Sequence, residues 1–298
     1  MTGEFLALAA AMFLVALLYS SVGHAGASGY IAVLTLFGLG VEEIRPAALS
    51  LNILVAAIGF IQWWRGGYFS WSLFWPFALL SAPAAFFGGW IQVPAQHLKI
   101  LIGLVLWFSA WRLLCRKEDP VDLARPARTM SIASGAGIGF LSGLTGTGGG
   151  IFLTPLLLFC RWAKVKEAAA VSSLFILVNS SSGLAGYVRS GRELPDFAWP
   201  LAAVVAVGGF IGARLGSRHL PVRSIAVLLA VVLVMFWTRG KEFSFRSKVA
   251  SFRQRFVGKV RWVVAVLAFL WQDQSNDWFH HSLPTAQPPN RRLLLGLF

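Results

Sequence analysis

Two glycine-rich segments interrupt the apolar sequence and carry the residues best placed for chemistry. The first spans residues 20–29 and contributes Gly23, His24, Gly26, Ser28 and Gly29. The second spans residues 142–150 and contributes Gly146, Thr147, Gly148, Gly149 and Gly150. Glycine allows positive φ angles and close approach to a ligand. A helix that restarts after such a break, here at Tyr30 or Ile151, directs free N–H groups and a positive dipole end at the gap, which favours an anion.

The equivalent positions of the two breaks point to a binding site at membrane depth. Non-helical backbone inside a membrane is tolerated only where protein or water satisfies it. Matching breaks in two halves of a chain are typical of transporter sites. The alternative is close helix packing through small residues. We predict that the glycines of both breaks bind substrate.

His24 is the histidine that falls inside the apolar core, whereas His97 and His219 fall in loops and His280 and His281 near the end of the chain. An imidazole has an ordinary pKa near ~6.5, so it can lend a proton or a positive charge to an anion. An ionisable group inside a membrane segment is a functional candidate by default. The alternative is a neutral packing histidine. We predict that His24 binds substrate and couples its movement to protons.

Each half has one asparagine in its third apolar segment: Asn52, close to Ser50, in the first half, and Asn179, seven residues after Ser172, in the second. Amides and hydroxyls can coordinate an oxyanion through neutral donors. The alternative is hydrogen bonding between helices, worth only about 0.6–2 kcal/mol per contact. We predict that both asparagines belong to the substrate site.

Motifs of enzymes and metal sites are absent from the sequence. Apart from Glu4, no carboxylate falls inside a predicted apolar segment, and neither HExxH nor GxSxG occurs. The Gly146–Gly148 stretch resembles part of a dinucleotide fingerprint but lacks the strand and helix that this fingerprint requires. Cys115 and Cys160 have neither metal nor redox spacing. We predict no catalysis, no cofactor and no metal.

The composition indicates a membrane protein of several spans. Of 298 residues, 57% are apolar and 13% are charged, which is about half the charged share of a soluble domain. This excludes a disordered chain, a nucleic-acid module and a disulfide scaffold, and it disfavours a soluble enzyme. The net charge of +14 divides equally between residues 1–238 and 239–298. Basic residues between apolar stretches orient helices in the membrane, so they do not indicate a nucleic-acid partner.

The sequence indicates two copies of one unit. When it is shifted by 121–124 residues, Trp75-Pro76 falls on Trp199-Pro200 and Arg65 falls on Arg189. Each copy holds five apolar segments. They are residues 5–22, 30–39, 47–61, 71–87 and 98–114 in the first copy, and 132–144, 151–159, 168–188, 197–211 and 225–237 in the second.

Charge counting separates two topologies. If the first two segments of each copy form a hairpin, each copy crosses three times, the second copy is inverted, and Lys and Arg divide 12 against 4 between the two sides. If they form one broken crossing, the copies are parallel and the division is 8 against 8. Including six basic residues of the following tail makes the hairpin count 12 against 10. We predict inverted repeats whose glycine-broken hairpins meet near the middle of the membrane.

Four regions follow. Residues 1–115 and 130–238 form the two membrane repeats, and 116–129 form a cytoplasmic linker. In residues 239–298, apolar side chains recur at helical spacing from Phe245 to Val260 among Arg and Lys. Such a basic amphipathic helix typically lies on anionic lipid, and we expect the polar, Pro-rich end to be disordered. A membrane-surface extension and the product of an altered reading frame both fit this tail.

The second break and its continuation, residues 143–156, together with the partner segment 20–30, resemble the sulfite exporter TauE/SafE family of membrane permeases. Residues 47–59 and 168–186 add to the resemblance, which covers residues 5–235. Ala27 departs from it where the family often has glycine, and the tail has no counterpart. The resemblance implies movement of sulfite, organosulfonates or related sulfur oxyanions.

We therefore predict a secondary transporter of the cytoplasmic membrane that exports small sulfur oxyanions. Its partners are the anion and membrane lipid, and a homo-oligomer is compatible with the sequence. The alternatives are a permease for another small anion and a non-transporting membrane scaffold that acts through its basic tail. An intramembrane enzyme is disfavoured by the missing acid and base groups.

Overall fold

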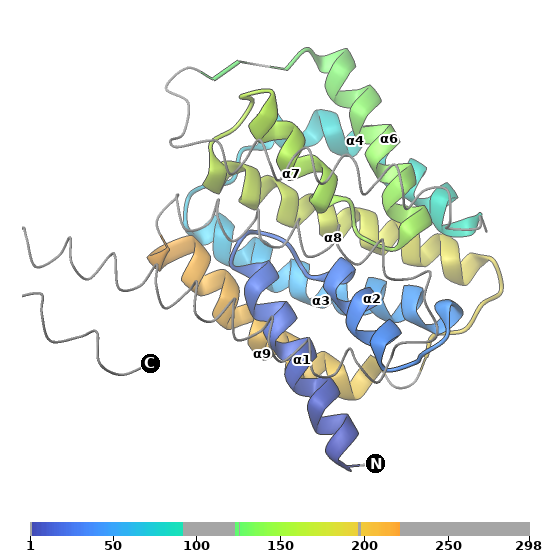
Figure 1. Ribbon diagram of the computed structural model, residues 1–298. Coiled ribbons are helices and arrows are strands. Elements are labelled where there is room, and N and C mark those ends of the chain that lie inside the picture. The colour runs from blue at the N-terminus through green and yellow to red at the C-terminus, as the bar shows by residue number, and fades with distance from the viewer. Residues whose placement is uncertain (1, 92–122, 125, 196–197, 221–298) are drawn as a thin grey trace, which may run out of the picture. The chain divides into compact units, whose positions relative to one another are not determined.

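The computed structural model describes residues 2–91, 123–124, 126–195 and 198–220, and every regular element in these ranges is helical. In chain order the elements are α1 (Thr2–Ser20), α2 (Ala27–Leu36), α3 (Val41–Arg65), α4 (Trp71–Trp90), α6 (Arg128–Thr145), α7 (Gly150–Phe159), α8 (Val165–Arg189), α9 (Ala198–Arg214) and the π-helical turn η1 (Leu215–His219) (Figure 1). The predicted fifth segment of each half, most of the linker and the tail lie outside the described residues.

Helix lengths fall into two classes that matter for a membrane. Among the described residues, five helices are long and apolar enough to cross one: Gly3–Ser20, Glu43–Arg65, Trp71–Trp90, Val165–Arg189 and Ala198–His219. By contrast, α2 and α7 have 10 residues each. At ~1.5 Å per residue each short helix covers about 15 Å, half of a hydrocarbon core of about 30 Å. The predicted all-helical membrane architecture is confirmed for the described part of the chain.

Helices of one half pack against helices of the other half (Figure 1). The long helices α3 and α8 pack against each other at the centre. From there α8 packs against α4, which in turn packs against α6, whereas α3 packs against α9, which packs against α1. The short helices α2 and α7 lie on α3 and α8 respectively. The pairings come in equivalent sets: α4 with α6 corresponds to α9 with α1, and α8 with α4 corresponds to α3 with α9. Two repeats would produce this correspondence. The inversion of the second repeat stays a prediction.

Glycines allow the outer pairs to approach to backbone contact. Every fourth residue of α6 from Gly135 to Gly143 lies against the backbone of α4, and Gly208, Gly212 and Gly216 lie in the same way against α1 and the residue after it. A methyl group on Gly139 would meet the backbone of Ser81, and one on Gly212 that of Leu17. The small-residue packing considered above for the breaks therefore operates between these helices.

Side chains are distributed as in a lipid-embedded bundle. Large apolar residues face outwards on the peripheral helices, with Trp199 72% and Leu6 67% exposed. Polar residues occupy the interior, and Asn52 and Asn179 are both fully buried. This arrangement satisfies polar groups inside protein and presents apolar ones to hydrocarbon.

The third helix starts earlier than its apolar pattern suggests. It begins at Val41 instead of Ala47, and the Glu43 carboxylate accepts a hydrogen bond from the Gly40 backbone at 3.3 Å. Pro46 is tolerated because it falls close to the helix start. The expectation that only Glu4 among the carboxylates lies in an apolar segment is wrong, because Glu43 and Glu167 lie in the first turns of α3 and α8.

Candidate functional site

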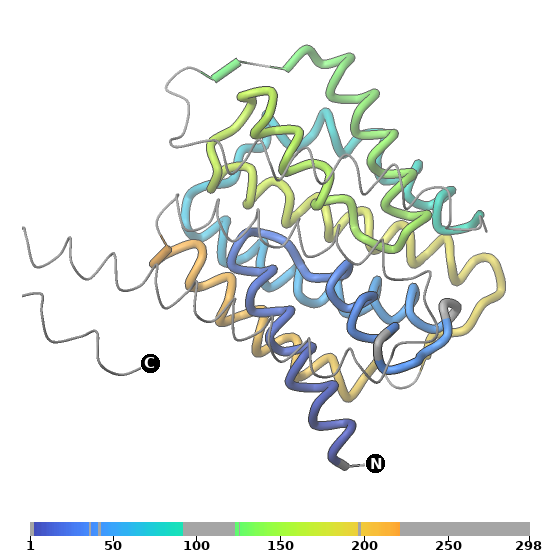
Figure 2. Tube along the Cα trace, viewed as in Figure 1, coloured from blue at the N-terminus to red at the C-terminus, as the bar shows by residue number. Residues whose placement is uncertain are grey.

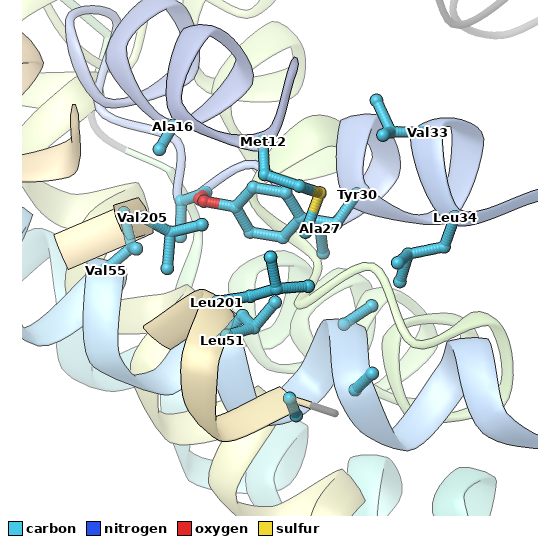
Figure 3. Packing of buried hydrophobic residues seen from close by; sticks show 14 of the residues in the cluster. Met12, Ala16, Ala27, Tyr30, Val33, Leu34, Leu51, Val55, Leu201 and Val205 are labelled. Carbon is cyan, nitrogen blue, oxygen red and sulfur yellow. The ribbon is translucent and has the colours of Figure 1, made fainter. Parts of the chain in front are cut away.

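The first break, residues 21–26, joins α1 to α2 through two left-handed glycines. Gly23 has φ of 81° and Gly26 has φ of 104°. The Tyr30 hydroxyl donates to the Ala25 carbonyl at 2.7 Å. Its ring lies among Met12, Leu201 and other apolar side chains (Figure 3). Side chains from three helices thus fix the shape of this break.

The second break, residues 146–149, joins α6 to α7 in the same way. Gly146, Gly148 and Gly149 have φ of 76°, 77° and 82°. Gly146 and Gly149 are three residues apart, as are Gly23 and Gly26, and the trace turns at both places (Figure 2). A side chain would be strained at each of these positions, so the glycines are required by the backbone path.

The helices restart at Ala27 and Gly150, three residues and one residue earlier than expected. Ser28 and Gly29 consequently belong to α2 and face α1. The Ser28 hydroxyl donates to the Tyr19 hydroxyl at 3.1 Å, and a methyl group on Gly29 would meet Val15. These contacts give both residues a packing role between α1 and α2.

His24 extends from the first break to the short helix that follows the second. Its Nε2 lies 3.3 Å from the Thr154 hydroxyl, which donates to the Ser172 hydroxyl at 2.6 Å. A methyl group on Gly150 would lie 3.1 Å from His24 Cδ2. The imidazole is 5% exposed, and its Nδ1 has no hydrogen-bond partner among the described residues. The imidazole of His24 therefore lies beside the start of α7, and one of its two nitrogens has no described partner.

Asn52 of α3 connects the two breaks. Its Oδ1 accepts a hydrogen bond from the Ala27 backbone N–H at 3.1 Å, and its Nδ2 donates to the Ser180 hydroxyl at 3.0 Å. A methyl group on Gly148 would collide with that Nδ2 and with Ile176. Since Ile176 also lies against Gly150, the surroundings of Asn52 and His24 adjoin.

Asn179 lies in a different environment. Its Oδ1 accepts from the Ser81 hydroxyl of α4 at 2.6 Å, and its Nδ2 has no partner among the described residues. Thr147 is 6% exposed, and its hydroxyl lies 2.9 Å from that of Thr145. A methyl group on Gly149 would lie 3.0 Å from Phe175. Of the predicted residues, the structure brings His24, Asn52, Gly148 and Gly150 together most closely.

Neutral groups and one imidazole dominate the chemistry of this region. Around His24 and Asn52 the polar atoms are hydroxyls, carboxamides and backbone groups, and the Arg45 guanidinium lies at the α6 end of the second break. Within the described ranges no cluster of three or more His, Cys, Asp or Glu side chains is arranged to hold a metal ion. Such an environment can receive an anion through hydrogen-bond donors and helix N-termini.

Thr154 and Arg45 contribute contacts that the sequence analysis did not predict. Thr154 is the sole polar residue of the apolar α7 sequence, which was an available signal. Arg45 falls between the predicted apolar segments 30–39 and 47–61, although it lies inside α3. Each residue has one partner in the other half of the chain, Gly143 for Arg45 and His24 for Thr154, and spacing along the sequence could not reveal these partners.

Comparisons with known proteins agree with this architecture. Residues 8–239 match the family described as Sulfite exporter TauE/SafE. A probable membrane transporter protein (y4hK) of Sinorhizobium fredii is 41% identical over 241 residues, covering 79% of this chain and 97% of that protein. Another, from Methanocaldococcus jannaschii, is 25% identical over 239 residues, covering 74% and 89%. A shorter match of 31% identity over 110 residues, covering 34% and 24%, is to Sulfite exporter TauE/SafE family protein 1 of Arabidopsis thaliana.

No solved structure matches the chain significantly. The family match includes both glycine breaks and all the described helices from residue 8 onwards, and it ends where the basic tail begins. With five helices long enough to span a membrane, these relatives make the chain an integral membrane protein that crosses the membrane several times. The chain belongs to the sulfite exporter TauE/SafE family of membrane transporters.

Proposed function

We propose that this protein is a secondary permease that exports small sulfur oxyanions, such as sulfite or an organosulfonate, through a site between its two glycine breaks. The observation that carries the proposal is the meeting of His24 from the first break with the start of α7 after the second. An unsatisfied imidazole nitrogen beside a helix N-terminus suits an anion.

We further propose that the second repeat is inverted relative to the first. The exchange of helix partners between the halves supports this arrangement, as does the uneven distribution of Lys and Arg. In an inverted pair, the two short helices approach the middle of the membrane from opposite sides. Their N-termini then face one shared site, as in other transporters with broken helices.

The membrane potential supplies the driving force in this mechanism. A potential that is negative inside favours exit of an anion by about 2.3 kcal/mol per charge per 100 mV. A divalent oxyanion gains about twice that amount, so export requires no nucleotide. Uptake against the potential would require a coupled cation, and we propose His24 as the group that carries the proton.

Flux in proteoliposomes tests the proposal. Purified protein is reconstituted, a potential is imposed, and radiolabelled sulfite flux is measured with sulfate and a sulfonate as competitors. We expect potential-driven flux that His24→Ala reduces by about tenfold or more, since it removes a buried polar contact worth about 1–3 kcal/mol. His219→Ala is the matched control, because the side chain of His219 is exposed. Correctly inserted protein with no flux of any of these anions would reject the proposed substrate class.

A further inference from the structure

Arg45 joins the ends of two helices to the second break. One of its terminal nitrogens, Nη2, donates to the carbonyls of Gly88 at 2.8 Å and Gly89 at 3.1 Å, and also to the Gly143 carbonyl. Gly88 and Gly89 lie in the last turn of α4, and Gly143 lies in the last turn of α6. A residue of the first half therefore holds the helix that leads into the break of the second half.

Helix ends account for the attraction. The last carbonyls of a helix lack intrahelical partners and carry the negative end of its dipole, so a cation is stabilised there. Both ends are brought together by glycines: a methyl group on Gly143 would collide with the backbone of Ala85, and one on Gly88 with that of Phe140. In the described part of the chain, these carbonyls are the hydrogen-bond partners of the guanidinium, and no carboxylate pairs with it.

The contact extends into the break itself. A methyl group on Gly146 would lie 3.0 Å from Cγ of Arg45. Gly146 is the C-cap of α6 and the first left-handed glycine of the break. The stem of Arg45 thus lies against the residue where the backbone leaves the helix, while its head group binds a carbonyl three residues earlier.

Arg192 provides a natural comparison. It also donates to the Gly89 carbonyl, at 3.1 Å, and to the Trp90 carbonyl at 3.3 Å. Its guanidinium carbon lies 4.1 Å from the centre of the Tyr187 ring, which Arg45 also faces at 5.9 Å. Its described hydrogen bonds reach α4 and Ser190 but no residue of α6 or of the break. The two arginines share one helix end and differ in their contact with the second break.

We propose that Arg45 is a positioning residue for the second glycine break: it fixes the end of α6 so that Gly146–Gly149 hold the path that directs the α7 N-terminus at the substrate site. The structural part of this proposal is independent of the substrate. Its consequence for transport rests on the proposed function.

Cysteine accessibility tests the structural part directly. Thr147→Cys, in a background with Cys115→Ser and Cys160→Ser, reports on the second break, and Ala25→Cys in the same background reports on the first. Arg45→Gln is expected to raise the labelling rate at position 147 by about tenfold, because it removes the charge-assisted hydrogen bonds that hold the end of α6. The labelling rate at position 25 should change by less than about twofold. Arg192→Gln should change neither rate by more than about twofold.

The conservative variant Arg45→Lys retains the charge but not the planar fork, and its labelling rate should fall between those of the parent and Arg45→Gln. Size-exclusion profiles and thermal unfolding identify variants that fail to fold. If Arg45→Gln does not fold, the labelling rates of Arg45→Lys and Arg192→Lys are compared instead. Equal effects of the Arg45 and Arg192 substitutions, or parallel opening of both breaks, would overturn the proposal by showing general loosening.

Flux measurements on the same variants separate this proposal from the proposed function. We expect Arg45→Gln to raise KM for sulfite by about tenfold, again from the lost charged contact, with a smaller change in the maximal rate. Opening of the second break without any sulfite flux in the parent would reject the function and retain the role of Arg45. Unchanged labelling and unchanged KM in Arg45→Gln would reject the positioning role.

Discussion

The carboxamide of Asn52 lies against Gly148, so a helix of the first half packs directly on the glycine break of the second. The same carboxamide binds the Ala27 N–H at the start of α2. One side chain therefore contacts both breaks. Movement of either break, as a transport cycle requires, must alter the hydrogen bonds of Asn52.

Substitutions of Asn52 should change anion affinity in a graded order. Asn52→Asp keeps an acceptor for Ala27, loses the donor to Ser180 and adds a negative charge to the site. We expect KM for the transported anion to rise by about tenfold or more, because a like charge at short range opposes anion binding. Ser180→Ala removes one neutral hydrogen bond and should raise KM by about threefold. Equal KM values for the parent and Asn52→Asp would place the anion away from Asn52.

The left-handed conformation of Gly149 predicts a loss of transport without a loss of insertion. Gly149→Leu forces a β-carbon into a backbone with φ of 82° and against Phe175, Ile138 and Ser142. Such strain costs about 1–3 kcal/mol, which we expect to lower sulfite flux by about tenfold or more. Gly137→Leu is the matched control, because nothing lies within 4 Å of a β-carbon there. Equal flux in the two variants would count against a functional second break.

Proton coupling through His24 predicts a specific change in pH dependence. With a sulfonate as substrate, whose charge is fixed, flux should vary with pH, because proton coupling requires the His24 imidazole to gain and lose a proton during the transport cycle. His24→Asn should abolish this variation, because the amide does not titrate, whereas His219→Asn should keep it. A parent whose sulfonate flux is independent of pH would leave His24 with a hydrogen-bonding role alone.

Cys160 offers a test of the inverted topology. Burial raises the pKa of its thiol above the ordinary value, so less thiolate is present at neutral pH and labelling should accelerate as the pH rises. Cys160 adjoins Arg161, which the hairpin topology places on the same side as the cytoplasmic linker. In a Cys115→Ser background, an impermeant maleimide should label it only after the cells are permeabilised.

Glu193→Cys, introduced into a chain without other cysteines, should show the opposite behaviour and label in intact cells. Glu193 adjoins Arg192, which the hairpin topology places on the side opposite the cytoplasm. Pro120→Cys extends the test to the linker and should behave like Cys160. Labelling of position 120 from outside would reject the assignment.

Packing between the outer helices predicts large stability effects from small changes. Gly212→Ala places a methyl group on the backbone of Leu17, and overpacking of this kind costs about 1–3 kcal/mol. Thermal unfolding of the purified protein should therefore occur at lower temperature than in the parent. Gly137→Ala should leave the unfolding temperature unchanged or raise it, because alanine favours a helix over glycine by up to ~1 kcal/mol.

Much of the architecture follows from the sequence because local patterns determine it. Apolar runs predict the long helices, and clustered glycines predict both breaks. The early start of α3 was missed because Pro46 normally marks a helix boundary, yet it falls where a helix start accommodates it. Ser28 and Gly29 were assigned to the break because the restart of α2 depends on the positive φ of Gly26, which composition alone does not locate.

The site itself was only partly predictable, for a reason that lies in its construction. His24 and Asn52 stand out as polar residues in apolar surroundings. Their partners Thr154 and Ser180 come from the other half, more than a hundred positions away. No periodicity links such residues, because the packing of α3 on α8 brings them together. Arg45 and Gly143, which lie 98 positions apart in α3 and α6, likewise meet across the two halves.

The exchange of partners between the halves also has a consequence for biosynthesis. When the ribosome has released the chain only as far as residue 127, α1 and α4 are complete, but α9 and α6, against which they pack, do not yet exist. The surfaces of α1 and α4 that later receive the glycines of α9 and α6 lack their partners until the second half arrives. Completion of the bundle is therefore a late event in synthesis, and a chain truncated between the halves leaves these surfaces uncovered.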